Sequence, residues 1–285
     1  MNATPQPMTA QLRQWILEQA AAGRPAPELI DAMQRSGWRE EVAVNAVQQV
    51  LRQQLEQTAE QQGLPPASAV PEPALAGAPL FIDLGDRQVS VLMNLARPRV
   101  VLFGNLLAPE ECQALIDAAR PRLARSLTVA TATGGEEINA DRTSNGMFFQ
   151  RGESPLVQRL EQRIARLLNW PLENGEGLQV LHYRPGAQYK PHYDYFDPQE
   201  PGTASILRRG GQRVATLVMY LNDPLQGGGT TFPEAFLEIG PRQGNAVFFS
   251  YERPHPSTGT LHGGAPVIAG EKWIATKWLR QGEFK

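Results

Sequence analysis

The chain has 285 residues, a formal net charge of -2 and a single cysteine, Cys112. This length allows one large domain or two smaller ones. Because acidic and basic residues are balanced, the composition argues against a nucleic-acid-binding protein, which normally carries a basic excess. One cysteine excludes a disulfide framework and a CxxC zinc site. The sequence shows neither a signal-peptide pattern nor an apolar stretch of membrane-spanning length, so we expect a soluble, cytoplasmic protein without a membrane partner.

Residues 1–57 predict a small module of three helices. Apolar side chains recur at helical spacing in three runs, around Ile16, Met33 and Val47, and glycine or proline separates the runs. The stretch around Ser36-Gly37-Trp38 loosely resembles ubiquitin-associated-type three-helix modules, which implies a protein partner for these helices. The alternative is a helical appendage used for dimerisation or docking.

A stretch rich in alanine and proline follows this module. Residues 58–79 show no hydrophobic periodicity, and this composition predicts a semi-rigid linker. The linker places the second domain at residues 80–285.

The second domain begins with mixed helices and strands and ends with strands alone. Helices are expected to begin at Pro109 and after Ser154, where proline fits the first helical position and serine is a good N-cap. Strands are expected at 178–183, 214–221, 246–250 and 272–278. Because strands and helices no longer alternate, a parallel doubly wound sheet is excluded. We predict an α+β, mainly β fold with a double-stranded β-helix (jelly-roll) core and supporting helices.

His192 and Asp194 form the first candidate site. Residues i and i+2 of an extended strand point to the same face, so an imidazole and a carboxylate converge there. Two histidines and one carboxylate on one side of an ion suit non-haem Fe(II) with O₂. His262 is the downstream histidine that completes this set. A His-x-Asp pair alone occurs by chance in many chains, and its alternative interpretation is a surface pair.

Lys272 provides a second, independent signal. Strand alternation places Lys272 on the same face as Ile274, Thr276 and Trp278, where an unpaired cation would be costly. A dicarboxylate co-substrate would supply the missing anion. The alternative is that Lys272 points to solvent and Trp273 points inward.

The segment 181–196 resembles the metal-binding stretch of the 2-oxoglutarate- and Fe(II)-dependent prolyl 4-hydroxylases. Further stretches resemble the same family in the same order, at 98–103 with 110–112, 141–148, 210–216, 227–233 and 262–278. The resemblance covers roughly residues 95–280 and leaves out the first 80. Two departures, Gly229 in place of a common acidic residue and a short segment after Pro233, concern substrate selectivity.

The resemblance implies roles for individual residues. His192, Asp194 and His262 match the iron ligands, and Lys272 matches the lysine that pairs with the far carboxylate of 2-oxoglutarate. Other matched residues are Tyr183 and Thr230 beside that carboxylate, Tyr189, Arg213 and Trp278 near the iron and the peptide groove, and the loop Arg142-Thr143-Ser144 on the substrate side.

The resemblance also implies the reaction. With Fe(II), 2-oxoglutarate and O₂, the protein would hydroxylate a prolyl residue in a peptide or protein and release succinate and CO₂, with ascorbate as reductant. The alternatives are oxidation of a free amino acid or small metabolite, an inactive barrel that serves as a binding adaptor, and, more distantly, a zinc hydrolase. We expect His182 to have a structural role and His255 to be a loop residue.

Overall fold

The computed structural model divides the chain into two compact units, Met1–Ala67 and Ser68–Lys285. It describes residues 8–126, 128–130, 135–137 and 141–285, and no side chains between 127 and 140. Within these residues, no helix has both the length and the apolar character needed to cross a membrane.

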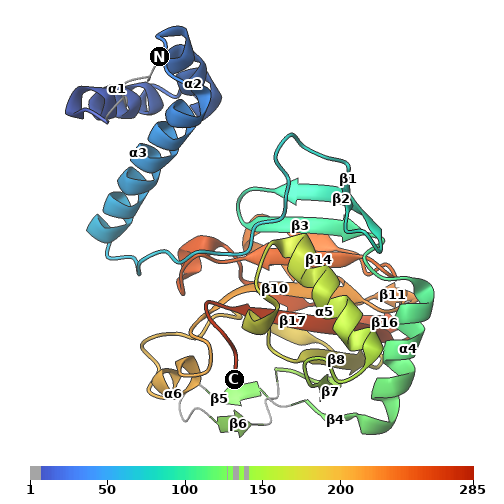
Figure 1. Ribbon diagram of the computed structural model, residues 1–285. Helices are drawn as coiled ribbons and strands as arrows, with labels where there is room; N and C mark the ends of the chain where they lie inside the picture. Colours follow the sequence, from blue (N-terminus) through green and yellow to red (C-terminus); the bar gives the residue numbers. More distant parts are fainter. Residues whose placement is uncertain (1–7, 127, 131–134, 138–140) are drawn as a thin grey trace. The chain divides into compact units, whose positions relative to one another are not determined.

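The first unit is a bundle of three helices, α1 (Ala10–Ala21), α2 (Ala26–Arg35) and α3 (Glu40–Gln61) (Figure 1). The hydroxyl of Thr9 caps α1 by accepting a hydrogen bond from the amide of Leu12. The apolar runs seen in the sequence form one small core, which contains Ile16, Leu29, Met33, Ala43, Ala46, Val47 and Val50.

The bounds of the units differ from the predicted linker. Helix α3 continues to Gln61, four residues past the predicted end of the module. From Ser68 onward the chain belongs to the second unit, where Pro71 and Pro73 are buried. Glu72 forms an ion pair with Arg99 at 2.5 Å. The boundary between the two units thus falls between Ala67 and Ser68, inside the predicted linker, and the functions expected of the linker and the domains stay predictions.

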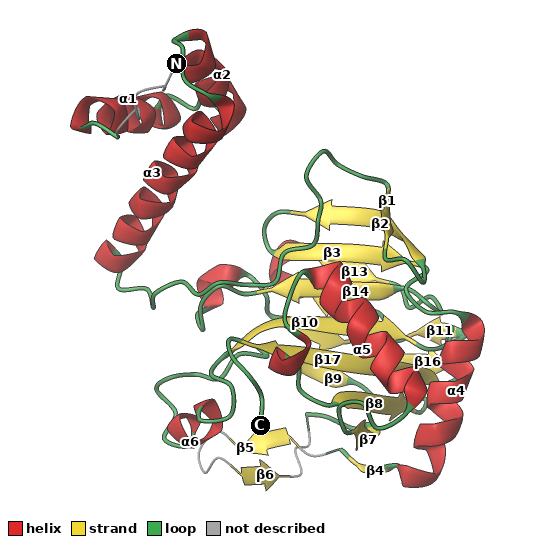
Figure 2. Ribbon diagram, in the orientation of Figure 1, coloured by secondary structure: helices red, strands yellow, loops and turns green. Residues whose placement is uncertain are grey.

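The second unit is built on a nine-stranded sheet (Figure 2). Its strands, in spatial order, are β1 (Phe81–Asp83), β2 (Gln88–Leu95), β3 (Arg99–Gly104), β14 (Ala246–Ser250), β10 (Arg213–Tyr220), β17 (Lys272–Arg280), β8 (Leu178–Tyr183), β7 (Asn145–Phe149) and β4 (Ala124–Arg125).

A four-stranded sheet forms the second layer, in the order β13 (Leu237–Ile239), β12 (Thr230–Phe232), β15 (His262–Gly264) and β9 (Tyr189–His192). Side chains from both sheets, among them Val218, Phe232 and Phe249, form one apolar cluster. In the part of the chain that the structure describes, two short ribbons accompany these sheets: β11 (Gln226–Gly227) with β16 (Val267–Ala269), and β5 (Thr128–Ala130) with β6 (Gly135–Glu137). The predicted jelly-roll core is confirmed.

Helices α4 (Pro109–Ala119) and α5 (Pro155–Leu168) pack on the other face of the large sheet, and a short α6 (Thr203–Leu207) follows β9 (Figure 1). As predicted, α5 begins after Ser154, whose hydroxyl accepts from the amide of Val157 at 3.2 Å. Among the described residues, four single-turn 3₁₀ helices occur at Arg120–Arg122, Leu172–Asn174, Pro233–Ala235 and Pro256–Thr258.

Strand β17 separates two environments, as its alternation predicts. Lys272, Ile274, Thr276 and Trp278 line a cavity between the two sheets. Trp273, Ala275 and Leu279 belong to the cluster that packs against the helices. Lys272 is 3% exposed, so the interpretation in which it points to solvent is wrong.

Candidate active site

His192, Asp194 and His262 converge at one point of the cavity between the sheets. One ligand atom from each residue lies within 4.8 Å of the others. The Nε2 atom of His192 is 3.6 Å from Oδ1 of Asp194, and Nε2 of His262 is 3.5 Å from Oδ2. Strands β9 and β15 bring the histidines together, because His192 pairs with His262 in the antiparallel register.

The route by which Asp194 reaches this point differs from the prediction. Strand β9 ends at His192, so Asp194 lies just beyond it rather than two residues along an extended strand. The strand pairing therefore positions the two imidazoles, whereas hydrogen bonds position the carboxylate.

Both imidazoles are oriented by the main chain. Nδ1 of His192 lies 2.8 Å from the carbonyl oxygen of Lys190, and Nδ1 of His262 lies 3.0 Å from that of Thr260. A protonated Nδ1 that donates to a carbonyl leaves Nε2 with its lone pair, which is the tautomer that binds a metal ion. Burial lowers the pKa of His262 to about 4, so this ring is neutral at physiological pH.

The carboxylate of Asp194 is buried and held in its ionised form. Burial alone would raise its pKa, but the neighbouring His262, His192 and Arg213 keep the pKa well below its usual range. Its Oδ2 accepts a hydrogen bond from the Thr216 hydroxyl at 2.7 Å, and that hydroxyl lies 3.0 Å from the Tyr251 hydroxyl. Two imidazole nitrogens and one carboxylate on the same side fit an ion such as Fe(II) that keeps open positions for other ligands.

Lys272 lies in the same cavity as these three residues. Burial lowers its pKa to about 8, and Glu238 is the charge that opposes this shift. Its Nζ lies 5.5 Å from the ring centroid of Tyr183 and 5.9 Å from that of Tyr220. A buried ammonium flanked by aromatic rings is poised for an anionic ligand.

Tyr183 and Thr230, which the resemblance matched to residues beside the 2-oxoglutarate carboxylate, also line this inner cavity. The Thr230 hydroxyl accepts a hydrogen bond from Tyr220 at 2.8 Å. The sequence interpretation did not single out Tyr220. Its position in β10, with Thr216 and Val218 on the same strand face, is the signal that would have found it.

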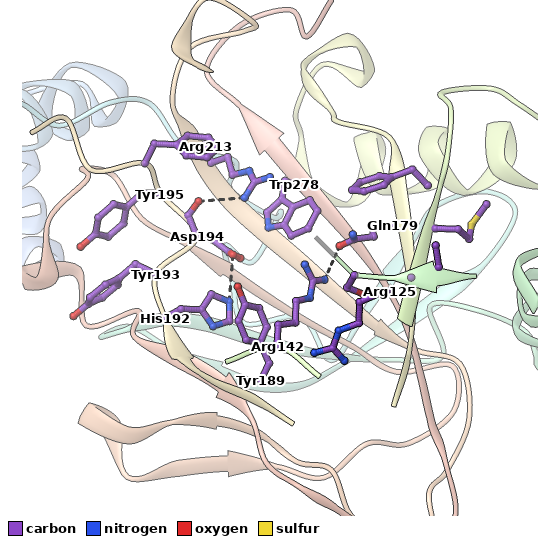
Figure 3. Close-up of a pocket in the computed structure, with 16 residues that line it drawn as sticks. Arg125, Arg142, Gln179, Tyr189, His192, Tyr193, Asp194, Tyr195, Arg213 and Trp278 are labelled. Atoms are coloured by element: carbon purple, nitrogen blue, oxygen red, sulfur yellow. Dashed lines mark hydrogen bonds and ion pairs between the residues drawn. The ribbon is translucent and has the colours of Figure 1, made fainter. Parts of the chain in front are cut away.

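A second, outer cavity of about 290 Å³ adjoins the first (Figure 3). Both cavities share Arg142, Tyr189, His192, Asp194 and Trp278. The ring of Tyr189 stacks on His192 at 3.6 Å, and the guanidinium of Arg142 lies 5.1 Å above the ring of Tyr189. The structure therefore places these predicted site residues beside the metal ligands.

Arg213 lies in the wall of the outer cavity between two rings, 4.0 Å from Trp278 and 4.8 Å from Phe196. Its guanidinium donates two hydrogen bonds to Glu176, at 2.7 and 3.0 Å, and Glu176 also accepts from Arg280. The sequence interpretation missed Glu176, since nothing in the pattern links residues 37 positions apart.

The other two histidines lie elsewhere. Nε2 of His182 is 2.7 Å from Glu271, and its ring stacks on Trp273 at 4.2 Å. Nδ1 of His255 accepts a hydrogen bond from the amide of Ser257 in a loop. Neither residue lines the two cavities, which agrees with the expected structural roles.

Comparison with known proteins gives the same class of protein. Residues 178–280 match the model of the 2OG-Fe(II) oxygenase superfamily. The probable prolyl 4-hydroxylase 3 of Arabidopsis thaliana is 40% identical over 222 residues, which cover 70% of this chain and 75% of the relative. Prolyl 4-hydroxylase 5 of the same plant is 41% identical over 222 residues, covering 70% of this chain and 74% of the relative.

A solved structure is also similar. The viral collagen prolyl hydroxylase of Paramecium Bursaria Chlorella virus-1, in complex with 2-oxoglutarate, is 30% identical, with a TM-score of 0.49 over 64% of this chain and 95% of that chain.

The fold and the site thus define an oxygenase that uses Fe(II), 2-oxoglutarate and O₂. Within that superfamily, the chain belongs to the prolyl 4-hydroxylase family.

Proposed function

We propose that this protein hydroxylates prolyl residues in a peptide or protein, using 2-oxoglutarate and O₂ as co-substrates. One observation carries the proposal. The cavity that holds His192, Asp194 and His262 also holds the buried Lys272, and it adjoins an outer cavity lined by aromatic and arginine side chains.

His192, Asp194 and His262 would hold the Fe(II) ion. When bound, Fe(II) supplies the redox chemistry that couples decarboxylation of 2-oxoglutarate, to succinate and CO₂, with transfer of oxygen from O₂ to a substrate C–H bond. The chain itself contributes orientation and exclusion of water, because His262 and Asp194 are buried and no acid–base pair is needed.

Lys272 would bind the carboxylate of 2-oxoglutarate that is farther from the metal, and Tyr183 and Thr230 would contact the same group. An anion here offsets the cost of burying an ammonium with no carboxylate within ion-pair distance among the described residues. A zinc hydrolase would have no use for this lysine.

Tyr189, Arg142, Arg213 and Trp278 would orient the substrate next to the metal. The wall of the outer cavity includes Phe148, which is 41% exposed, so the cavity reaches the surface and can admit a peptide. This feature favours a peptide over a free amino acid or small metabolite. The intact set of ligands opposes the inactive-adaptor alternative. Ascorbate as reductant stays a prediction.

For the helical unit we propose a protein partner that docks beside Leu55, which is 63% exposed next to Leu17 and Leu51. The ubiquitin-associated-type resemblance and a cytoplasmic location stay predictions. Loss of partner capture on deletion of this unit, with turnover unchanged, would support separate roles for the two units.

The direct test of the proposed function incubates proline-containing peptides with the protein, Fe(II) and 2-oxoglutarate. Succinate and a peptide product with one added oxygen atom on proline are expected in equal amounts. Succinate formed without any oxidised peptide across a varied panel would contradict the proposed substrate class. His192→Ala, which removes a metal ligand, is the inactive control.

A further inference from the structure

Arginines predominate among the charged residues that line the outer cavity. Arg125, Arg142 and Arg213 line it, and Asp194 is the one carboxylate among the lining residues that the structure describes. Because Asp194 faces the metal position, the charge that a substrate meets beyond the metal is positive (Figure 3).

The three arginines are not equivalent. Arg213 is matched by the buried carboxylate of Glu176. Arg142 is 4% exposed, and one of its hydrogen bonds goes to the side-chain oxygen of Gln179 at 2.8 Å. Arg125 is exposed, and its side chain has no hydrogen bond or ion pair with any residue in the described part of the chain. Its charge is therefore the one that a ligand can use.

The backbone of Arg125 is fixed although its side chain is exposed. Strand β4 pairs with β7 at the edge of the large sheet, and Arg125 is opposite Asn145. Figure 3 shows the guanidinium groups of Arg125 and Arg142 on the same side of the cavity, with Arg142 between Arg125 and the metal ligands. A peptide whose proline lies at the metal would therefore bring a nearby residue to Arg125.

Two carboxylates that adjoin residues of the cavity wall have partners other than Arg125. Asp141 pairs with Lys190 at 2.6 Å, and Glu234 accepts a hydrogen bond from Tyr193 at 3.3 Å. No carboxylate among the described residues therefore pairs with the guanidinium of Arg125. A planar guanidinium binds a carboxylate through two parallel hydrogen bonds, and this geometry selects carboxylate over amide or ammonium.

We propose that Arg125, supported by the positive charge of Arg142, forms a subsite for a carboxylate carried by the substrate peptide near its target proline. This inference rests on the proposed function and deepens it, because it selects acidic proline-containing peptides as the substrate class. The carboxylate is that of an Asp or Glu side chain or that of a peptide chain end.

The test measures peptide binding by fluorescence anisotropy with the full chain, 2-oxoglutarate and Mn(II), which replaces Fe(II) so that no turnover occurs. The probes are short alanine-based peptides with one proline and amidated ends, in which one Glu is moved along the chain. Matched peptides carry Gln or Lys at the same place, and one further peptide has its proline close to a free carboxyl end.

At the best Glu position, we expect the Glu peptide to bind about tenfold more tightly than the Gln peptide, with the Lys peptide weakest. Arg125→Ala should abolish this order, and Arg125→Glu should reverse it in favour of Lys. Arg242→Glu, an equal change of net charge at an exposed residue outside both cavities, should leave the order unchanged. Preference for the free-end peptide alone would identify the chain end as the carboxylate.

Equal binding of the Glu, Gln and Lys peptides, an unchanged order in Arg125→Glu, or no binding of any peptide would overturn the subsite. The hydroxylation assay is read separately. Arg125-dependent binding without hydroxylation of any peptide would contradict the proposed function alone, and hydroxylation without a charge preference would contradict the subsite alone.

Discussion

The hydroxyl of Thr216 has a single proton, and its direction decides how Asp194 presents its two oxygens. An ionised carboxylate only accepts hydrogen bonds, so Thr216 donates to Oδ2 and must accept from the Tyr251 hydroxyl. This chain of two hydrogen bonds holds the carboxylate of Asp194 in place beside His192 and His262. Outer residues of this kind commonly tune metal affinity.

We therefore expect Thr216→Val to weaken metal binding by about tenfold or more, as measured by anaerobic Fe(II) titration. Tyr251→Phe should weaken it less. If Tyr251 acts only through Thr216, Tyr251→Phe should cause no further loss in the Thr216→Val background. Additive effects in this double-mutant cycle would show that Tyr251 acts by another route. Thr216→Ser, which keeps the hydroxyl, is the matched control.

The ammonium of Lys272 makes co-substrate binding dependent on pH. Its pKa is about 8 without ligand, below its ordinary value of 10.5, so the group is charged below pH 8 and increasingly neutral above it. A bound carboxylate favours the charged form. Affinity for 2-oxoglutarate should therefore be constant on the acid side of this pKa and fall by up to about tenfold per pH unit on the alkaline side.

Calorimetric titration of 2-oxoglutarate across this pH range checks the prediction. Lys272→Met should bind weakly at every pH and lose the alkaline decline. A decline of the same size in Lys272→Met would assign the pH dependence to another group.

Strand β17 is joined to helix α5 by a buried ion pair, with 2.6 Å between Nζ of Lys277 and Oε1 of Glu161 and both side chains 2% exposed. Gly175 leaves space for it, since a Cβ at Gly175 would lie 2.5 Å from Cε of Lys277. Because Lys272 and Trp278 belong to the same strand, this contact holds the strand that carries part of the site.

Removing one partner leaves the other charge buried, so Lys277→Met should lower the free energy of unfolding by about 3–5 kcal/mol. Replacing both residues, as Lys277→Met with Glu161→Met, should recover part of this loss. Lys190→Met, at an exposed ion pair, should cost no more than about 1 kcal/mol. Urea denaturation of the metal-free protein measures the free energy of unfolding of these three variants. A loss of less than about 1 kcal/mol in Lys277→Met would contradict the structural role of the Lys277–Glu161 pair.

The elements show where sequence reasoning succeeds. The alternation of β17 and the Ser154-Pro155 start of α5 are local patterns, and both are confirmed. The end of β9 at His192 was not predicted, because local alternation does not show where strand pairing stops. The partners Glu176, Tyr251 and Glu161 were missed for a related reason: each meets its partner only through the tertiary fold.

At the scale of the whole molecule, the two units have separate cores. A chain that starts at Ser68 should therefore fold and keep its turnover. A chain that starts at Leu80 also loses Pro71 and Pro73, the Glu72–Arg99 pair and the bond from the Ser68 amide to the carbonyl of Glu252.

The shorter chain should unfold at a lower urea concentration, with a loss of about 1–3 kcal/mol relative to the chain that starts at Ser68. Equal stability of the two truncations would show that residues 68–79 act as a linker, as the sequence interpretation had them. Loss of turnover in the chain that starts at Ser68 would instead assign the helical unit a part in catalysis.

The central claim is that His192, Asp194, His262 and Lys272 together support transfer of oxygen from O₂ to a prolyl residue. Turnover under isotopically labelled O₂, followed by mass spectrometry of the peptide and of succinate, tests it most directly. The account predicts one labelled oxygen atom on proline and one in succinate, and neither in His192→Ala. A hydroxyl derived from water, or labelled succinate without any labelled peptide, would contradict it.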